Sequence, residues 1–174
     1  VSQPIVQIFQ MAFILLIGIG SSSLISIKLG EGKKEEAEDI LYLAFKYIVL
    51  FLIVFSVLFL LFLNPLLSLL SVSKQVIPYA KIYIVIIVVG AIIGIPGYCL
   101  NNTLRAIGQA KMSMKIIVIT SILNIILDPI FIFTFKLGIA GAAIATVLSQ
   151  TVLTIYVVYA FIKRTDFLVN LKRR

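Results

Sequence analysis

The sequence predicts an all-α membrane protein with five transmembrane helices. Hydrophobic residues make up 61% of the 174 positions and charged residues only 13%, whereas soluble domains hold roughly 45–50% apolar and 25% charged residues. Apolar stretches of about 18 residues or more recur along the chain, and each can cross a hydrocarbon core of about 30 Å. These runs do not alternate polar with apolar residues as barrel strands do, so helices are expected.

We expect the five helices at residues 5–27, 40–63, 76–98, 114–133 and 139–162. Residues 28–39, a run of Gly, Lys and Glu, follow the first helix and must lie in water, because a membrane would not hold so many charges. Polar residues separate the second helix from the third at 64–65 and 71–75, and the third from the fourth at 101–111. A tight turn at 134–138 joins the last two helices.

The distribution of positive charge predicts the orientation of the chain. Most of the 15 Lys and Arg residues lie in 28–46, in 105–115 and in 163–174, a basic segment that forms a cytoplasmic tail or begins a linker. Three lie on the opposite side: Lys74, Lys81 and Lys136. Cytoplasmic loops carry the excess of Lys and Arg, so the C-terminus is expected in the cytoplasm and Val1 outside. Because no signal peptide is visible, this orientation predicts one further helix before Val1.

Composition also argues against several classes of function. The net charge of +8 comes from short basic clusters between apolar spans, so nucleic acid is not an expected partner. The sequence has no His and a single Cys, Cys99, which predicts neither a transition-metal site nor an intrachain disulfide. It contains no Walker loop and no nucleophile with a His partner, so we expect no enzyme activity, no cofactor and no ATP hydrolysis. If the chain belongs to a transporter, that transporter would have to use an ion gradient.

One acidic residue, Asp128, lies inside a predicted span, about 20 Å deep and past the midplane. A carboxylate there costs at least ~2.5 kcal/mol, so an ion or proton site is the first hypothesis. Thr120, Asn124 and Asp128 recur every four residues and form a polar stripe on one helix face. Pro129 frees the Ile125 carbonyl as a further cation ligand. The alternative is that Asp128 only caps a helical segment that begins at Pro129.

The last two predicted helices share a pattern of polar residues. Thr146, Gln150 and Thr154 also recur every four residues, and an antiparallel pair of helices would turn the two stripes toward one cavity. In the alternative reading these side chains only form hydrogen bonds across helices. Pro96, among several glycines of the third span, marks either a hinge or the end of that helix.

Three stretches resemble the multidrug and toxic compound extrusion family, in order and in spacing: Asn-Asn-Thr-Leu-Arg-Ala-Ile-Gly-Gln-Ala-Lys at 101–111, Asn-Ile-Ile-Leu-Asp-Pro-Ile-Phe-Ile-Phe at 124–133 and Gly-Ile-Ala-Gly-Ala-Ala-Ile-Ala-Thr at 138–146. The resemblance implies a partial six-helix lobe of a twelve-helix antiporter, with these spans as the second to sixth helices of the amino-terminal lobe. Residues 163–174 would begin the linker between lobes. The first helix and the second lobe would then be missing partners.

The same resemblance implies a function and a site. Family members export organic cations or drugs across the plasma membrane in exchange for protons or sodium. Their cation site matches Asn124, Asp128 and Thr146, whereas its first-helix Asp has no counterpart here. Thr120, Gln150 and Thr154 are expected to line the cavity, with Pro129 and Pro96 as hinges and sodium at Asp128 as the one metal ion.

We expect that neutralising Asp128 changes the bend at Pro129 and so couples ion entry to drug release. Two alternatives to this antiporter stay open. One is a flippase for lipid-linked oligosaccharides of the same superfamily, which would need a basic, water-filled cavity. The other is a membrane partner that transports nothing, or the product of a truncated gene.

Overall fold

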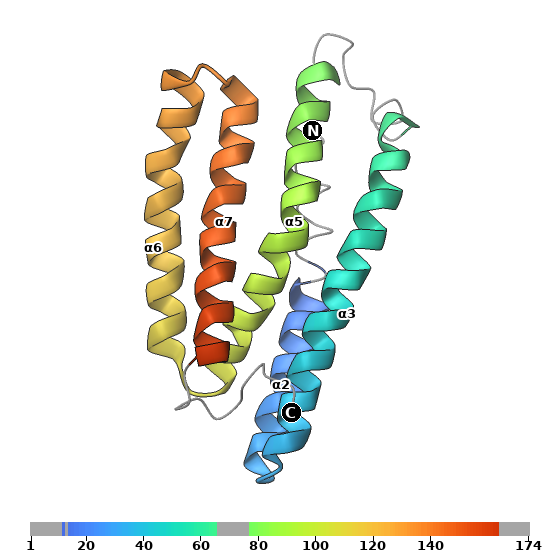
Figure 1. Ribbon diagram of the computed structural model, residues 1–174, viewed down its shortest axis with the longest axis vertical. Coiled ribbons are helices and arrows are strands. Elements are labelled where there is room, and N and C mark those ends of the chain that lie inside the picture. Colours follow the sequence, from blue (N-terminus) through green and yellow to red (C-terminus); the bar gives the residue numbers. More distant parts are fainter. Residues whose placement is uncertain (1–11, 13, 66–76, 164–174) are drawn as a thin grey trace.

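The computed structural model describes residues 12, 14–65 and 77–163, and within them every regular element is helical. Figure 1 shows long helices packed side by side, with neighbours along the chain running in opposite directions. The elements are η1 (Ile14–Ile19), α2 (Gly20–Gly30), α3 (Lys34–Leu61), α5 (Ile77–Ala106), α6 (Ala110–Pro129), η2 (Ile130–Thr134) and α7 (Gly138–Lys163), where η marks a π-helix.

Four helical stretches are long and apolar enough to cross a membrane: Lys34–Leu61, Ile77–Ala106, Ala110–Thr134 and Gly138–Lys163. A shorter apolar helix covers Leu16–Gly30, and it belongs to the first predicted span, whose opening residues lie outside the described part of the chain. The prediction of an all-α fold with helices long enough to cross a membrane is confirmed. The expected turn residues 71–75 and nearly all of 163–174 also lie outside the described residues.

Two connections are shorter than the sequence indicated. Helix α5 continues to Ala106 and α6 begins at Ala110, so most of the expected connection at 101–111 is helical. Gly108, with φ at 83°, closes α5: its N–H donates to the Arg105 carbonyl at 3.1 Å, and the next N–H, of Gln109, reaches Leu104 at 2.8 Å. This pattern is a Schellman motif, which ends a helix within two residues.

The same motif closes α2, so α3 begins at Lys34 rather than at residue 40. Gly32 has φ at 76°, and the N–H of Lys33 donates to the Lys28 carbonyl at 2.9 Å. The hairpin is surrounded by ion pairs, with the Lys28 Nζ 2.9 Å from Glu36 and 3.2 Å from Glu31. Hydrogen bonds from Lys28 and Lys33 lower the pKa of Glu31, which lies in the turn between the two helices.

Helices α5 and α7 pack closely because α5 presents glycines where α7 presents side chains. A Cβ on Gly94 would meet the Gln150 side chain, and one on Gly97 would lie 2.9 Å from the Thr154 Cα. Gly90 meets α7 in the same way one turn earlier. Small residues at this spacing let two membrane helices approach to backbone contact. These glycines therefore serve packing, and α5 runs without interruption through Pro96.

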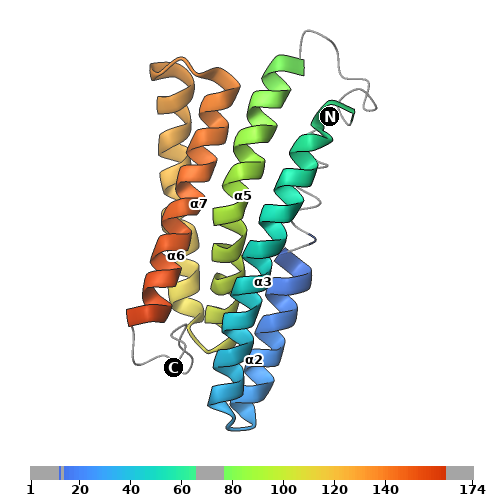
Figure 2. The same ribbon diagram turned by 45° about the vertical axis from the view of Figure 1, so that its right-hand side comes forward.

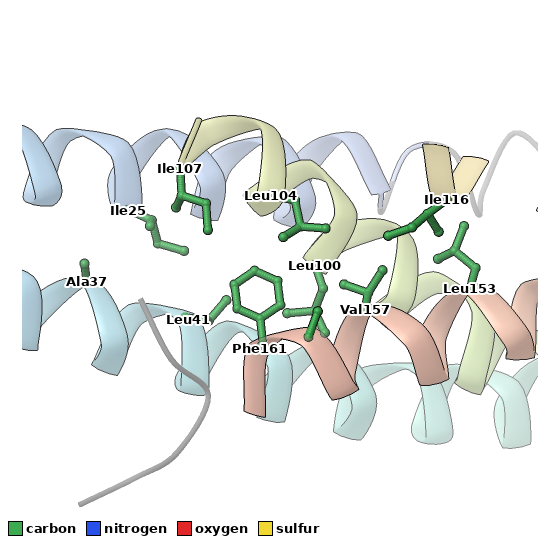
Figure 3. Packing of buried hydrophobic residues seen from close by; sticks show 11 residues of the cluster. Ile25, Ala37, Leu41, Leu100, Leu104, Ile107, Ile116, Leu153, Val157 and Phe161 are labelled. Atoms are coloured by element: carbon green, nitrogen blue, oxygen red, sulfur yellow. The ribbon is translucent and has the colours of Figure 1, made fainter. Parts of the chain in front are cut away.

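The largest apolar core joins all five long elements near the two short connections. Figure 3 shows the Phe161 ring of α7 between Leu41 of α3 and Leu100 of α5. The buried members of this core are Ile25, Ala37, Leu41, Leu100, Leu104, Ile107, Ile116, Leu153, Val157, Ala160 and Phe161. This core fixes the ends of α5, α6 and α7 against the α2–α3 hairpin, seen at the lower end of the molecule in Figures 1 and 2.

Candidate functional site

A polar pocket of about 210 Å³ lies where α5, α6 and α7 meet. Its lining combines one aromatic, one aliphatic and six small polar or amide side chains: Tyr98, Thr120, Ser121, Asn124, Ile125, Thr146, Ser149 and Gln150. The structure therefore brings together four of the residues singled out from the sequence, Thr120, Asn124, Thr146 and Gln150. The antiparallel pairing of α6 and α7, visible in Figure 1, turns the two stripes toward each other.

Three hydroxyl groups around this pocket donate their protons to their own helices. Thr120 donates to the Ile116 carbonyl, Thr146 to Ala142 and Ser149 to Ala145, each at 2.9 Å. A hydroxyl has one proton and two lone pairs, so these oxygens keep only acceptor capacity for a ligand. These three oxygens thus offer electron pairs, which suit a cation or a hydrogen-bond donor.

Asn124 and Asp128 carry buried polar atoms without a hydrogen-bond partner in the described part of the chain. These atoms are the Asn124 Nδ2 and the Asp128 Oδ1, one helical turn apart on α6. An unpaired buried polar atom costs about 1–3 kcal/mol, and more when it is charged. Asp128 is not among the residues that line the pocket, and the Tyr83 side chain of α5 lies within its electrostatic range. Asp128 is half-buried as a residue, and the described residues leave one of its carboxylate oxygens without a hydrogen-bond partner.

Thr154 does not line this pocket. Its hydroxyl lies at the α5–α7 contact, where it donates to the Ile93 carbonyl of α5 and to the Gln150 carbonyl of α7, each at 2.9 Å. Pro96 lacks an N–H, so the Ile92 carbonyl of α5 loses its helical partner, and the Ile93 carbonyl beside it accepts the Thr154 hydroxyl. Thr154 therefore supports the proline turn of α5.

Pro129 ends α6 and is followed directly by η2 rather than by a break. The wider turn is defined by the Phe135 N–H, which donates to the Ile130 carbonyl at 3.0 Å. Single π-helical turns inside helices occur often at functional sites. Gly141 of α7 packs against this segment so closely that a Cβ there would lie 2.6 Å from the Phe131 carbonyl oxygen. Any change of bend after Pro129 must therefore move the start of α7.

Sequence reasoning missed Tyr98 and Ser121 as pocket residues. Tyr98 stood at the end of a predicted span and lines the pocket because α5 continues past it. Ser121 follows Thr120 and lies on the edge of the same stripe.

The described residues contain no group of three or more His, Cys, Asp or Glu side chains that could hold a metal ion. A cation beside Asp128 would have one carboxylate and neutral hydroxyl, amide or carbonyl oxygens as ligands. Divalent hard cations usually take several carboxylates or phosphates. The described donor set around Asp128 is thus poor in carboxylates compared with such sites.

Comparison with known proteins identifies the family of this chain. The family model MatE matches residues 1–130. Probable multidrug resistance protein YpnP of Bacillus subtilis (strain 168) is 39% identical over 99 residues, which are 56% of this chain and 22% of that protein.

Two solved structures of a multidrug resistance MATE family transporter of the MOP superfamily are also similar. The inward-facing conformation has a TM-score of 0.89 at 29% identity, over 94% of this chain and 37% of that chain. The outward-facing conformation has a TM-score of 0.89 at 28% identity, over 95% of this chain and 37% of that chain. The chain thus spans well under half the length of the proteins that it matches.

The matched stretch includes Asn124 and Asp128, and the similarity to solved structures covers nearly all of the chain. These findings confirm the resemblance and the fold class predicted from the sequence. Proteins of this kind are multi-pass membrane transporters rather than enzymes. This chain belongs to the MatE family of multidrug efflux transporters, and it corresponds to part of the amino-terminal lobe.

Proposed function

We propose that this chain forms part of an antiporter that exports organic cations or drugs in exchange for protons or sodium. The observation that carries the proposal is the polar pocket between α5, α6 and α7, where three hydroxyl groups donate to backbone carbonyls and an unpaired carboxylate oxygen lies one turn further along α6. Polar groups inside a membrane helix bundle mark ion or substrate pathways. A further helix and a second lobe would complete the transport path.

The charge of the site favours cations. Within the described residues from 77 to 163, Asp128 is the one acidic side chain. Asn124 can turn its amide so that the oxygen, instead of the unpaired Nδ2, faces the cation, because no hydrogen bond in the described part of the chain holds that nitrogen. Asn124, Asp128 and Thr146 would then supply three oxygen ligands. A lipid-oligosaccharide flippase would need a basic cavity, but no Lys or Arg is among the residues that line this pocket.

Coupling would proceed through the segment after Pro129. A proton or sodium ion at Asp128 would supply the partner that its buried Oδ1 lacks among the described residues, and would so shift the balance between two conformers. Because Gly141 packs on the Phe131 backbone, a change in that segment reaches α7 directly. The equal similarity of the chain to inward-facing and outward-facing structures supports motion of this lobe largely as one unit against a second lobe.

Substitution of the carboxylate tests the proposal. In cells that express the complete reading frame, Asp128→Asn should lower ion-driven ethidium efflux by about tenfold or more, a loss of at least about 1.4 kcal/mol in transition-state stabilisation. Asp39→Asn removes an exposed acid of the α2–α3 hairpin and should leave efflux unchanged. Imposed sodium and pH gradients, applied separately, identify the coupling ion. Efflux that persists in Asp128→Asn would contradict the assigned role.

We further propose that the chain lies in the plasma membrane with the α2–α3 hairpin and the C-terminus in the cytoplasm. The excess of Lys and Arg at this end supports the orientation. Single cysteines can be introduced at Lys34 and at Lys136 after replacement of Cys99 by Ala. A membrane-impermeant maleimide should label Lys136→Cys in intact cells and Lys34→Cys only after lysis. The reverse pattern would overturn the orientation.

A further inference from the structure

Two positive side chains at the start of α6, Lys111 and Lys115, are exposed and form no ion pair within the described residues. The described acidic residues lie elsewhere, at 31–39 in the α2–α3 hairpin and at Asp128. Asp128 is 13 residues beyond Lys115, or about 20 Å along the helix. The first turn of α6 contains no acidic residue. This end of α6 therefore has uncompensated positive charge.

The two lysines line a groove of about 330 Å³ between α6 and α7. Its polar end combines them with Gln109, and along the helices it continues over Ile119, Val152 and Tyr156. Tyr156 is 51% exposed and Ile119 is 61% exposed, so the apolar part of the groove is open. A site with a cationic end and an apolar wall matches a molecule that has an anionic head and a hydrocarbon chain.

The position of the groove in the bundle indicates that its ligand is a membrane lipid. Figures 1 and 2 both show α6 and α7 on the side away from α2 and α3, and α6 with η2 has only 11% of its membrane window buried, the lowest share among the four spans. Its outer face is thus left uncovered by the described residues. Tyrosine and lysine are also the side chains that favour the headgroup level of a membrane.

We propose that this groove binds one anionic phospholipid of the cytoplasmic leaflet. Lys111 and Lys115 would hold its phosphate and headgroup, and an acyl chain would lie on Ile119, Val152 and Tyr156. Basic clusters next to a membrane span attract anionic lipids at about 1 kcal/mol per lysine, which is about fivefold in affinity. The choice of leaflet rests on the orientation proposed above. Thr120 lines both this groove and the polar pocket, so the lipid would lie directly behind the cation site.

Native mass spectrometry of the purified full chain tests the site without any transport measurement. Phosphatidylglycerol and phosphatidylcholine with identical acyl chains serve as probes. We expect the unchanged protein to retain more phosphatidylglycerol than phosphatidylcholine. In Lys111→Gln/Lys115→Gln the ratio of the two affinities should fall by about 25-fold. Lys81→Gln/Lys136→Gln makes the same change of charge at the other end of the spans and should retain the preference. Circular dichroism checks that both variants keep their helices.

Three outcomes would overturn the proposal. The two lipids could bind equally to the unchanged chain, or the Lys111→Gln/Lys115→Gln variant could retain the preference. Millimolar inorganic phosphate could displace phosphatidylglycerol completely, which would show a site for free phosphate that does not use the apolar wall. Because ion-driven efflux is not measured, a failed antiporter assignment would leave these readouts intact, and the reverse also holds.

Discussion

The α5–α7 contact and the α6 side of the pocket differ in how completely their polar groups are paired. Half of the α5 membrane window is buried and 33% of that of α7, against 11% for α6. At the α5–α7 contact the Thr154 hydroxyl donates to two carbonyls. On α6, Asn124 and Asp128 keep buried atoms without a partner in the described residues. The polar groups of one region are paired, whereas the other region keeps unpaired polar atoms at a cost in stability.

The difference predicts opposite responses to mutation. Changes at the α5–α7 contact should lower stability because they disturb a close fit between backbones. Removal of the unpaired polar atoms on α6 should cost no stability and should impair function instead. Three substitutions measure this contrast, in order of decreasing effect on stability.

The largest effect is expected for Gly97→Ala. The added Cβ would lie 2.9 Å from the Thr154 Cα, so α5 and α7 must separate. Overpacking of this kind costs about 1–3 kcal/mol, measurable as a loss in the free energy of unfolding in detergent. Gly20→Ala is the matched control, because a Cβ at Gly20 has nothing within 4 Å. Equal stability of the two variants would show that the helices do not pack this closely.

A smaller effect is expected for Thr154→Val, which keeps the side-chain shape and removes the hydroxyl. Loss of the bond to the Ile93 carbonyl should cost about 0.6 kcal/mol, and at most about 1.7. Thr151→Val is the control, since the Thr151 hydroxyl has a bond to the Val147 carbonyl of its own helix. Chemical denaturation of both proteins gives the comparison. A greater loss in Thr151→Val would refute a supporting role for Thr154 at the proline turn.

The smallest change in stability is expected for Asn124→Leu. This substitution removes a buried nitrogen that lacks a partner in the described residues, so the free energy of unfolding should stay level or rise by up to about 1 kcal/mol. Ion-driven efflux should fall, because one oxygen ligand beside Asp128 is lost. A loss of more than about 1 kcal/mol in stability would mean that the Asn124 amide is structurally bound, and the contrast between the two regions would fail.

Much of the helical architecture could be predicted from hydropathy, because a 28-residue α3 or a 26-residue α7 has few alternatives in a membrane. The connections were harder to predict. Asn101 and Thr103 have the polarity of a loop, yet both are buried, and the Thr103 hydroxyl lies 3.2 Å from that of Ser22 on α2. Such a contact depends on a segment 81 residues away, so no local pattern contains it.

The candidate site could be predicted only in part. Thr120, Asn124, Thr146 and Gln150 follow a four-residue spacing on two consecutive helices, and a short turn leaves little freedom in how these pair. Thr154 fits the same spacing but lies against Gly97, whose missing side chain admits it to the α5 backbone. Whether a threonine of this series faces the pocket or the α5 backbone depends on the residues of the opposite helix, which the spacing does not reveal.

The contact between Gly141 and the Phe131 backbone has one more consequence. Thr146 lies little more than one turn beyond Gly141, and Asp128 lies one turn before Phe131. A hairpin held this tightly would carry both groups through the same displacement, so the distance between carboxylate and hydroxyl should persist while their shared surroundings change. An ion bound there would keep its coordination during the movement and would leave only when water reached it from the new side.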